Sequence, residues 1–456
     1  MPTHLGMAFK NLGRNWRRNS ATASAVVLGY AGLLLLNGFV SHIEKFTRAT
    51  SIYLNHVGSV SVFRKDAVEH HLLNPKKFGL SSAEQEHIEQ IASKLFPENE
   101  GIGRYLEGFT LMGNGCKTWP VKIRGVPTSL EKMTVQHSRV QQFASELISN
   151  RRGQELWQFK KIIPVLVTDK VARNLGKKAI REKDLAVESG SLTSPAPECG
   201  SADWLMQTSR DPNVQVAGRT YQNELSAMDA EIIGYYKSGL ELLEESAALV
   251  PLRGLQQLFE TDNVTYMNVY LPWDTPAEPA AEKLSNALKE EGLDVEVFHY
   301  KNFAVNPFYA GFMNLIYVMS SFFLALAVGV VTLTVSDTMT MSVLERSREI
   351  GTLRAIGFRK RLITRIFAQE ASFLSLLSLP VGLLLALLVS WAVNTAGILF
   401  EIPGVATQIK VVIEIGSADS LLLALMLVGL TAFIGWLVSV RTSRKQVVTL
   451  LQSHVS

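Results

Sequence analysis

Residues 341–361 (MSVLERSREIGTLRAIGFRKR) are the part of this sequence whose residue types best suit the binding of another protein. Aliphatic side chains alternate there with arginines and glutamates, which is the general composition of a protein interface, with an apolar centre and a charged rim. Gly351 would allow close approach of another backbone, and Gly357 would end a short helix ahead of FRKR. The predicted docking set is Leu344, Glu345, Arg346, Arg348, Glu349, Ile350, Gly351, Leu353, Arg354, Ile356 and Gly357.

A second interpretation of the same segment involves no partner. Basic residues beside a membrane span fix its orientation, and charge runs are often only solvated. This explains the arginines but not the aliphatic residues between them. Both interpretations stay open on composition alone.

Four apolar runs flank or follow this segment: 21–40, 308–335, 371–393 and 420–440. The first has twenty residues without a charge, and at about 1.5 Å per helical residue it spans the roughly 30 Å hydrocarbon core of a bilayer. We therefore expect four transmembrane helices, with both termini on one side. The first run is longer than the apolar part of a signal peptide, so we expect an uncleaved anchor.

Lysine and arginine are concentrated in three of the flanking segments, which predicts cytoplasmic N- and C-termini by the positive-inside rule. The short loop between the third and fourth runs has only Lys410. The basic residues are Lys10, Arg14, Arg17 and Arg18, then Arg346, Arg348, Arg354, Arg359, Lys360, Arg361 and Arg365, and finally Arg441, Arg444 and Lys445.

Residues 41–307 would then lie outside the cytoplasm. This region has a net charge of −4, whereas the whole chain is +4, so the basic balance reflects topology and predicts no nucleic-acid partner. Its length suits one or two compact domains.

An α+β pattern runs through this exterior region, and its recurrence suggests two subdomains. Residues 181–218 interrupt the pattern with a polar, Ser/Pro/Gly-rich stretch that we interpret as an insertion. Strands are expected at 57–63, 119–126, 162–169, 231–236, 248–251, 265–271 and 293–299, and helices at 81–96 and 276–291, with a short one ending near Gly176.

The two cysteines, Cys116 and Cys199, both fall in the exterior region. An oxidising compartment would permit a disulfide between them. Two free thiols on separate segments are the alternative, because the sequence gives no distance between their Cα atoms.

Several segments together resemble a known family. Residues 345–357 (ERSREIGTLRAIG) are similar to the cytoplasmic signature of the FtsX-like permease domain found in MacB and in the lipoprotein-releasing permeases LolC and LolE. HVGSVSVFRKD, VKIRGV, VLVTDKVARNLG and EIIGYYKSGLELLEESAALVPLRGLQQLF resemble the MacB-type periplasmic core, and KNLGRNWRRNS resembles the family's basic amphipathic helix, here within residues 1–20.

The resemblance implies a permease subunit of a mechanotransmission-type ABC transporter in the bacterial inner membrane. Two copies of a separate ATPase would bind ATP and magnesium, since no GxxxxGK[ST] loop occurs in this sequence. The chain itself would be no enzyme and would hold no cofactor or metal. A second permease chain, identical or homologous, and an acceptor in the periplasm are further expected partners.

The resemblance leaves the cargo and several functions open. An amphiphilic cargo such as a lipoprotein or lipid is the leading expectation, and MacB-like export is the alternative within transport. An FtsX-like regulator of a cell-wall hydrolase, or a sensor with an exterior ligand domain, would use the same architecture without transport. The large exterior region favours transport over a minimal regulator.

Overall fold

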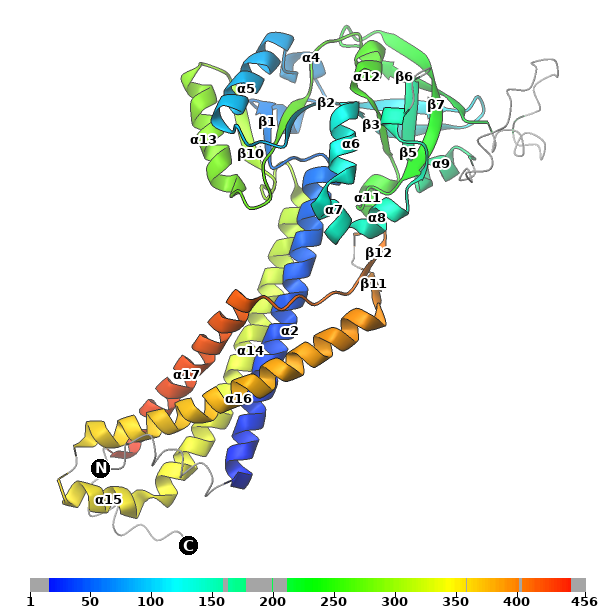
Figure 1. Cartoon of the computed structure of the whole chain (residues 1–456). Coiled ribbons are helices and arrows are strands. Elements are labelled where there is room, and N and C mark those ends of the chain that lie inside the picture. The colour runs from blue at the N-terminus through cyan, green and yellow to red at the C-terminus, as the bar shows by residue number, and fades with distance from the viewer. Residues whose placement is uncertain are drawn as a thin grey trace. The chain divides into compact units, whose positions relative to one another are not determined.

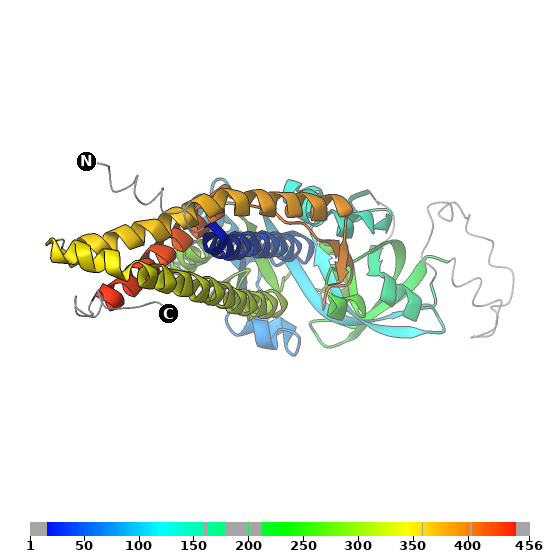
Figure 2. The same cartoon turned by 90° about the horizontal axis from the view of Figure 1, so that it is seen from below.

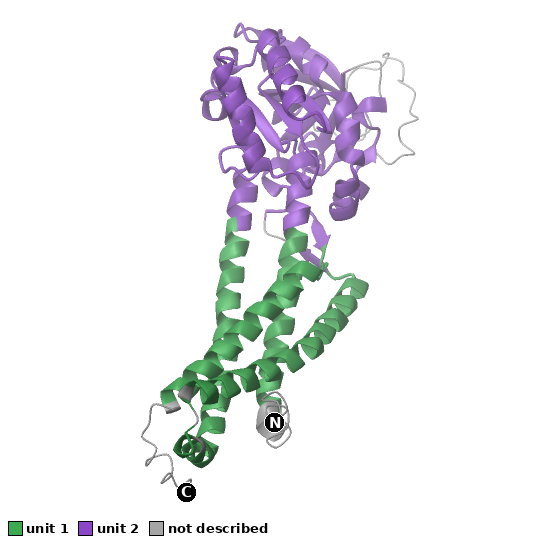
Figure 3. Cartoon of the chain, turned by 60° about the vertical axis from the view of Figure 1, so that its left-hand side comes forward, with its two compact units in different colours: residues 1–43, 314–398, 410–456 green, residues 44–313, 399–409 purple. Residues whose placement is uncertain are grey.

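The computed structural model describes residues 16–158, 163–177, 199, 211–357, 359–401 and 404–443. The chain divides into a helical unit (residues 1–43, 314–398 and 410–456) and an α/β unit (residues 44–313 and 399–409), coloured separately in Figure 3. Each unit has its own core. The predicted basic helix within residues 1–20 lies largely outside the described residues.

The helical unit contains the four helices that are long and apolar enough to cross a membrane, which confirms the four predicted spans. Each helix extends beyond the apolar run from which it was predicted. The four are α2 (Trp16–Ala49), α14 (Pro307–Glu345), α16 (Lys360–Ala396) and α17 (Ser417–Ser443). The short helix α15 (Ser347–Ala355) lies between α14 and α16 in the sequence. In Figure 2, α2 and α14 appear foreshortened, whereas α16 extends across the view along most of its length.

Small residues let these helices pack closely, as is common where lipid tails supply no hydrophobic drive for association. A Cβ on Gly29 of α2 would lie 2.8 Å from Val331 of α14. A Cβ on Gly435 of α17 would lie 2.8 Å from the side chain of Ala371 on α16. Larger side chains at these two glycines would therefore push neighbouring helices apart.

A mixed sheet of ten strands organises the α/β unit (Figure 1), in the order β10-β1-β9-β2-β3-β8-β5-β7-β4, with β6 paired to both β2 and β7. The β3–β8 and β5–β7 pairs are parallel and the other pairs are antiparallel. The strands are β1 (Val60–Arg64), β2 (Gly101–Gly113), β3 (Thr118–Val126), β4 (Arg152–Gly153), β5 (Ile163–Thr168), β6 (Asn213–Arg219), β7 (Leu225–Tyr236), β8 (Ala247–Pro251), β9 (Tyr266–Tyr270) and β10 (Val295–His299).

Strand β2 joins two lobes of this unit. Its first half, Gly101–Tyr105, pairs with β9, and its second half, Leu106–Gly113, pairs with β3. The first lobe packs α5 (Ser82–Leu95) and α13 (Ala277–Glu290) on β1, β9 and β10. The second packs α9 (Asp169–Asn174) and α12 (Leu252–Phe259) on β3, β5, β6, β7 and β8.

The remaining elements are short. They are η1, a π-helix that continues from α2 (Thr50–Leu54), α3 (Ala67–His70), α4 (Pro75–Phe78), α6 (Thr128–Gln136), α7 (Ser138–Phe143), α8 (Ser145–Ser149), η2 (Leu156–Gln158), α11 (Glu241–Glu244), β11 (Leu399–Glu401) and β12 (Gln408–Lys410).

One expectation in this region needs correction. The predicted insertion at 181–218 ends earlier than expected, because Asn213–Arg219 form β6 and pair with both β2 and β7. Alternation of exposed and buried residues along β6 marks a half-buried strand. Residues 181–198 and 200–210 lie outside the described part of the chain.

Candidate functional site

Helix α15 is the element that holds most of the predicted docking residues. It joins the ends of α14 and α16 and begins directly after Arg346 (Figure 1). Gly357 follows it with φ of +100°, a backbone conformation that favours glycine, so the helix stops where the sequence predicted. The chain then turns into α16.

The two faces of α15 differ sharply in exposure. Ile350 is only 4% exposed and belongs to the core of the helical unit together with Val343, Ile363 and Phe367. Ser347 and Gly351 are buried on the same side. This packing corrects one detail of the sequence interpretation, because it makes Ile350 a core residue and not a surface one.

Arg348, Glu349 and Thr352 are exposed on α15, as are Glu345 just before the helix and Ile356 just after it. These five residues are called the outward face of α15 below. Ile356 is a large aliphatic side chain that is 70% exposed. Leu344, just before this face, is 39% exposed. The outward face therefore keeps the mixed charged and apolar character that the sequence predicted.

The other predicted residues divide between these settings. Arg346 is 8% exposed, Arg354 is partly buried and Gly357 is exposed. The side chain of Leu353 lies outside the described residues. Leu344, Ile356 and the outward-facing charges are thus the docking candidates that this chain presents on its surface.

A buried ion pair fixes the start of α15. The Arg346 guanidinium lies 3.1 Å from the carboxylate of Glu370 on α16, and the two side chains are 10% and 4% exposed. Arg365 is the basic residue nearest to Glu370 along the same helix, whereas Arg346 lies 24 positions away in the sequence. Spacing along one helix carries no information on this long-range pair, so it could not be predicted from the sequence.

A second set of buried charges lies in the α/β unit, beside His56, two residues after η1 ends. His56 Nε2 lies 2.5 Å from a carboxylate oxygen of Glu131 on α6, and Arg151 lies 3.1 Å from the other oxygen. Burial alone would raise the pKa of Glu131, but His56 and Arg151 lower it to about 2. Burial lowers the pKa of His56 itself. This arrangement ties the segment after α2 to α6.

A third cluster is centred on Glu107 of β2. Arg124 and Lys122 of β3 lie 2.6 and 2.8 Å from its carboxylate, and Arg124 also donates to the backbone carbonyl of Asn55. Burial would raise the pKa of Glu107, but Lys122 and Arg124 hold it well below its usual range. These clusters organise the fold, and we assign them no catalytic role.

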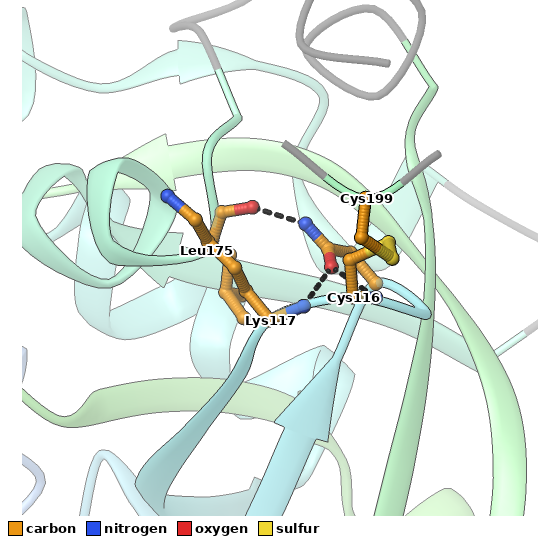
Figure 4. Close-up of a disulfide and its surroundings, with 5 residues drawn as sticks. Cys116, Lys117, Leu175 and Cys199 are labelled. Atoms are coloured by element: carbon orange, nitrogen blue, oxygen red, sulfur yellow. Dashed lines mark hydrogen bonds between the residues drawn. A yellow bond between two sulfur atoms is a disulfide. The ribbon is translucent and has the colours of Figure 1, made fainter. Parts of the chain in front are cut away.

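Cys116 and Cys199 form a disulfide in the structure, with Cα atoms 5.6 Å apart (Figure 4). Cys116 lies in the turn between β2 and β3. The side chain of Asn114 holds this turn by accepting from the backbone N–H of Lys117 at 2.7 Å and by donating to the carbonyl of Leu175. The bridge thus fastens residue 199 to an ordered hairpin.

Residues 317–447 match the family of the FtsX-like permease C-terminal domain. The chain is 33% identical over 116 residues to the ABC transporter permease YtrF of Bacillus subtilis (strain 168), covering 25% of this chain and 26% of that protein. It is 27% identical over 162 residues to the ABC transporter permease MJ1507 of Methanocaldococcus jannaschii, covering 35% of this chain and 40% of that protein. The chain thus spans well under half the length of these relatives.

Two solved structures share similarity with more than half of the chain. One is the extracellular domain of the ABC-type transporter YknZ from Gram-positive bacteria, at 14% identity and a TM-score of 0.30, covering 53% of this chain and 99% of that one. The other is the periplasmic region of MacB from Actinobacillus actinomycetemcomitans, at 9% identity and a TM-score of 0.31, covering 55% and 91%.

The residues that match the family include the candidate docking segment around α15. The match begins within α14 and includes α15, α16 and α17. Residues 317–447 of this membrane protein are thus similar to the FtsX-like permease C-terminal domain, and α15 is the segment of the matched region that joins two of its long helices.

Proposed function

We propose that this chain is the permease subunit of an ABC transporter of the mechanotransmission type. A separate ATPase, present in two copies, binds the outward face of α15 on the cytoplasmic side. Its nucleotide-driven closure moves the α/β unit, which lies on the opposite side of the bacterial inner membrane. The cargo is amphiphilic, such as a lipoprotein or lipid, and a second permease chain completes the complex.

The outward face of α15 is the main support for this proposal. A helix that only obeyed the positive-inside rule would need arginines but no exposed aliphatic residue. Ile356 is 70% exposed and lies about two helical turns from the exposed Arg348 and Glu349, which suits a contact with an apolar centre and a charged rim. The buried Arg346–Glu370 pair also supports ATPase docking at this segment, because it links the start of α15 to the long helix α16, which could transmit a movement of α15.

Ile356→Asp tests the docking step. The residue is exposed, so the variant should fold and insert normally, but a carboxylate buried unpaired in an apolar contact costs several kcal/mol, against about 0–1 kcal/mol for an exposed ion pair. We expect loss of co-purification with the ATPase and loss of cargo-stimulated ATP hydrolysis in reconstituted membranes. Ile350→Asp is unsuitable for this test, because Ile350 is a core residue.

Leu242→Asp is the matched control, since Leu242 is 85% exposed and lies on α11 of the α/β unit. It should leave ATPase binding at the wild-type level. ATPase binding by Ile356→Asp equal to that of this control would show that α15 is not the docking element. Normal ATPase binding with no cargo-dependent hydrolysis in the wild type would instead favour a regulator or a sensor.

A further inference from the structure

Arg48 is a cation without a counter-ion among the described residues. Its guanidinium donates to the backbone carbonyl of Trp273, and its Nε is buried without any hydrogen-bond partner. Glu44, one turn earlier on α2, forms no ion pair with it in the described structure. A guanidinium has five N–H donors and is always charged, so partial burial with one acceptor leaves most of its binding capacity unused.

Aromatic rings hold this guanidinium in place. Its central carbon lies 4.1 Å from the ring centre of Trp273 and 5.3 Å from that of Tyr300. Arg139 contacts the ring of Trp273 as well, at 5.3 Å. Stacking on rings fixes the plane of an arginine and leaves its edge available for an anion.

A pocket of about 310 Å³ opens beside Arg48, and charges of both signs line it. Lys301 adds a second cation, whereas Asp274 and Glu278 contribute carboxylates. A simple anion would use only half of these groups. A ligand that carries a phosphate and an ammonium a few bonds apart would use both.

The position of Arg48 in the sequence brings this pocket to a membrane surface. Arg48 lies eight residues after Val40, where the first apolar run ends, and both belong to the continuous helix α2. At about 1.5 Å per residue, this is about 12 Å along the helix, and side chains on a helix lean back toward its N-terminus. Tryptophan and tyrosine are enriched at this level of membrane proteins.

We propose that the pocket lined by Arg48, Trp273, Asp274, Glu278, Tyr300 and Lys301 binds the headgroup of a zwitterionic phospholipid with a primary ammonium, the chemistry of phosphatidylethanolamine. Arg48 and Lys301 bind the phosphate, and Asp274 and Glu278 bind the ammonium. The site anchors the α/β unit to the bilayer surface beside α2. It is independent of cargo and of the ATPase, and it rests only on the membrane placement of α2.

Native mass spectrometry of the full chain in mild detergent tests this site with three probes of identical acyl chains: phosphatidylethanolamine, phosphatidylglycerol and phosphatidylcholine. We expect wild type to retain phosphatidylethanolamine best. Arg48→Ala should weaken that retention about tenfold, the size expected for one charge-assisted hydrogen bond. Arg48→Lys should fall between the two, because it keeps the charge and loses the planar fork.

Arg219→Ala is the control of equal charge, since Arg219 is exposed on β6 and its side chain bonds only to Asn223 in the described structure. Asp274→Asn should weaken the retention of phosphatidylethanolamine but not that of phosphatidylglycerol. This variant tests the site even if Arg48→Ala is unstable. Three results would each overturn the proposal: equal lipid retention by Arg48→Ala and Arg219→Ala, preference for phosphatidylglycerol, or displacement of the lipid by equimolar inorganic phosphate. The last would indicate a site for soluble phosphate.

Discussion

Removal of one partner from the Arg346–Glu370 pair should destabilise the helical unit strongly. The two groups lie 3.1 Å apart and are almost fully buried. At an effective dielectric constant of about 20, their attraction is about 5 kcal/mol. Each charge has also lost several kcal/mol of hydration, so the net contribution of the intact pair is small.

Glu370→Gln leaves the Arg346 cation buried without its partner, and Arg346→Met leaves the carboxylate in the same position. Such a loss typically costs about 3–5 kcal/mol. For a unit of this size, that is a fall in melting temperature of roughly 6–20 °C. The double variant Arg346→Met/Glu370→Leu removes both charges and should recover most of this loss.

Thermal unfolding of the purified chain in one detergent, followed by intrinsic fluorescence, measures all three variants. Arg348→Met serves as the control, because Arg348 is exposed on the same helix and should change stability by less than about 0.5 kcal/mol. If the two single losses simply add in the double variant, the residues are not coupled and the ion pair does not hold α15. ATPase stimulation by the two single variants and the double variant should follow the same order as their stability. Arg348→Met is a control for stability alone, because Arg348 belongs to the outward face of α15.

Three further predictions concern other parts of the molecule. Cys116→Ser should cost about 2–5 kcal/mol, given the 83-residue separation from Cys199, and reductant should lower the melting temperature of wild type but not of this variant. The pKa of Glu131 is depressed from 4.5 to about 2, so this carboxylate contributes about 3 kcal/mol to the free energy of unfolding above pH 4.5. That contribution is lost as the pH falls to about 2, and the stability of Glu131→Gln should lack this pH dependence. Gly435→Val should lower thermal stability by about 1–3 kcal/mol through overpacking against Ala371, whereas Gly329→Val, at a glycine with open space around it, should not.

The four spans could be predicted from the sequence because the signal is local. A run of about twenty apolar residues predicts a membrane span whatever the run packs against, since the bilayer thickness sets the length that is needed. Helix α5 was predicted for a similar reason, because Ile88, Ile91 and Leu95 recur at helical spacing, and all three pack in or against the core of the first lobe. Ser81 also caps this helix reciprocally with Glu84.

Strand β2 was not predicted, although it is the longest strand described and the one that joins the two lobes. Four glycines weaken its pattern, since glycine is a poor strand former. Their reason lies in tertiary packing: a Cβ on Gly108 would lie 2.5 Å from Phe259 of α12, and one on Gly103 would lie 2.5 Å from Leu130 of α6. The glycines make room for helices that come later in the sequence.

The residues around α15 also show that burial could not be predicted from the sequence alone. From the sequence, Arg346 and Arg348 are equivalent, since each adds one charge to a basic loop. In the structure Arg346 is buried against Glu370 and Arg348 is exposed, so only the second can contact a partner. The two arginines face different sides of the segment, and which side each faces depends on where α14 ends and α15 begins. Topology therefore follows from how many arginines the loop holds, whereas coupling depends on which of them face outward, and only variants chosen by face can distinguish the two roles.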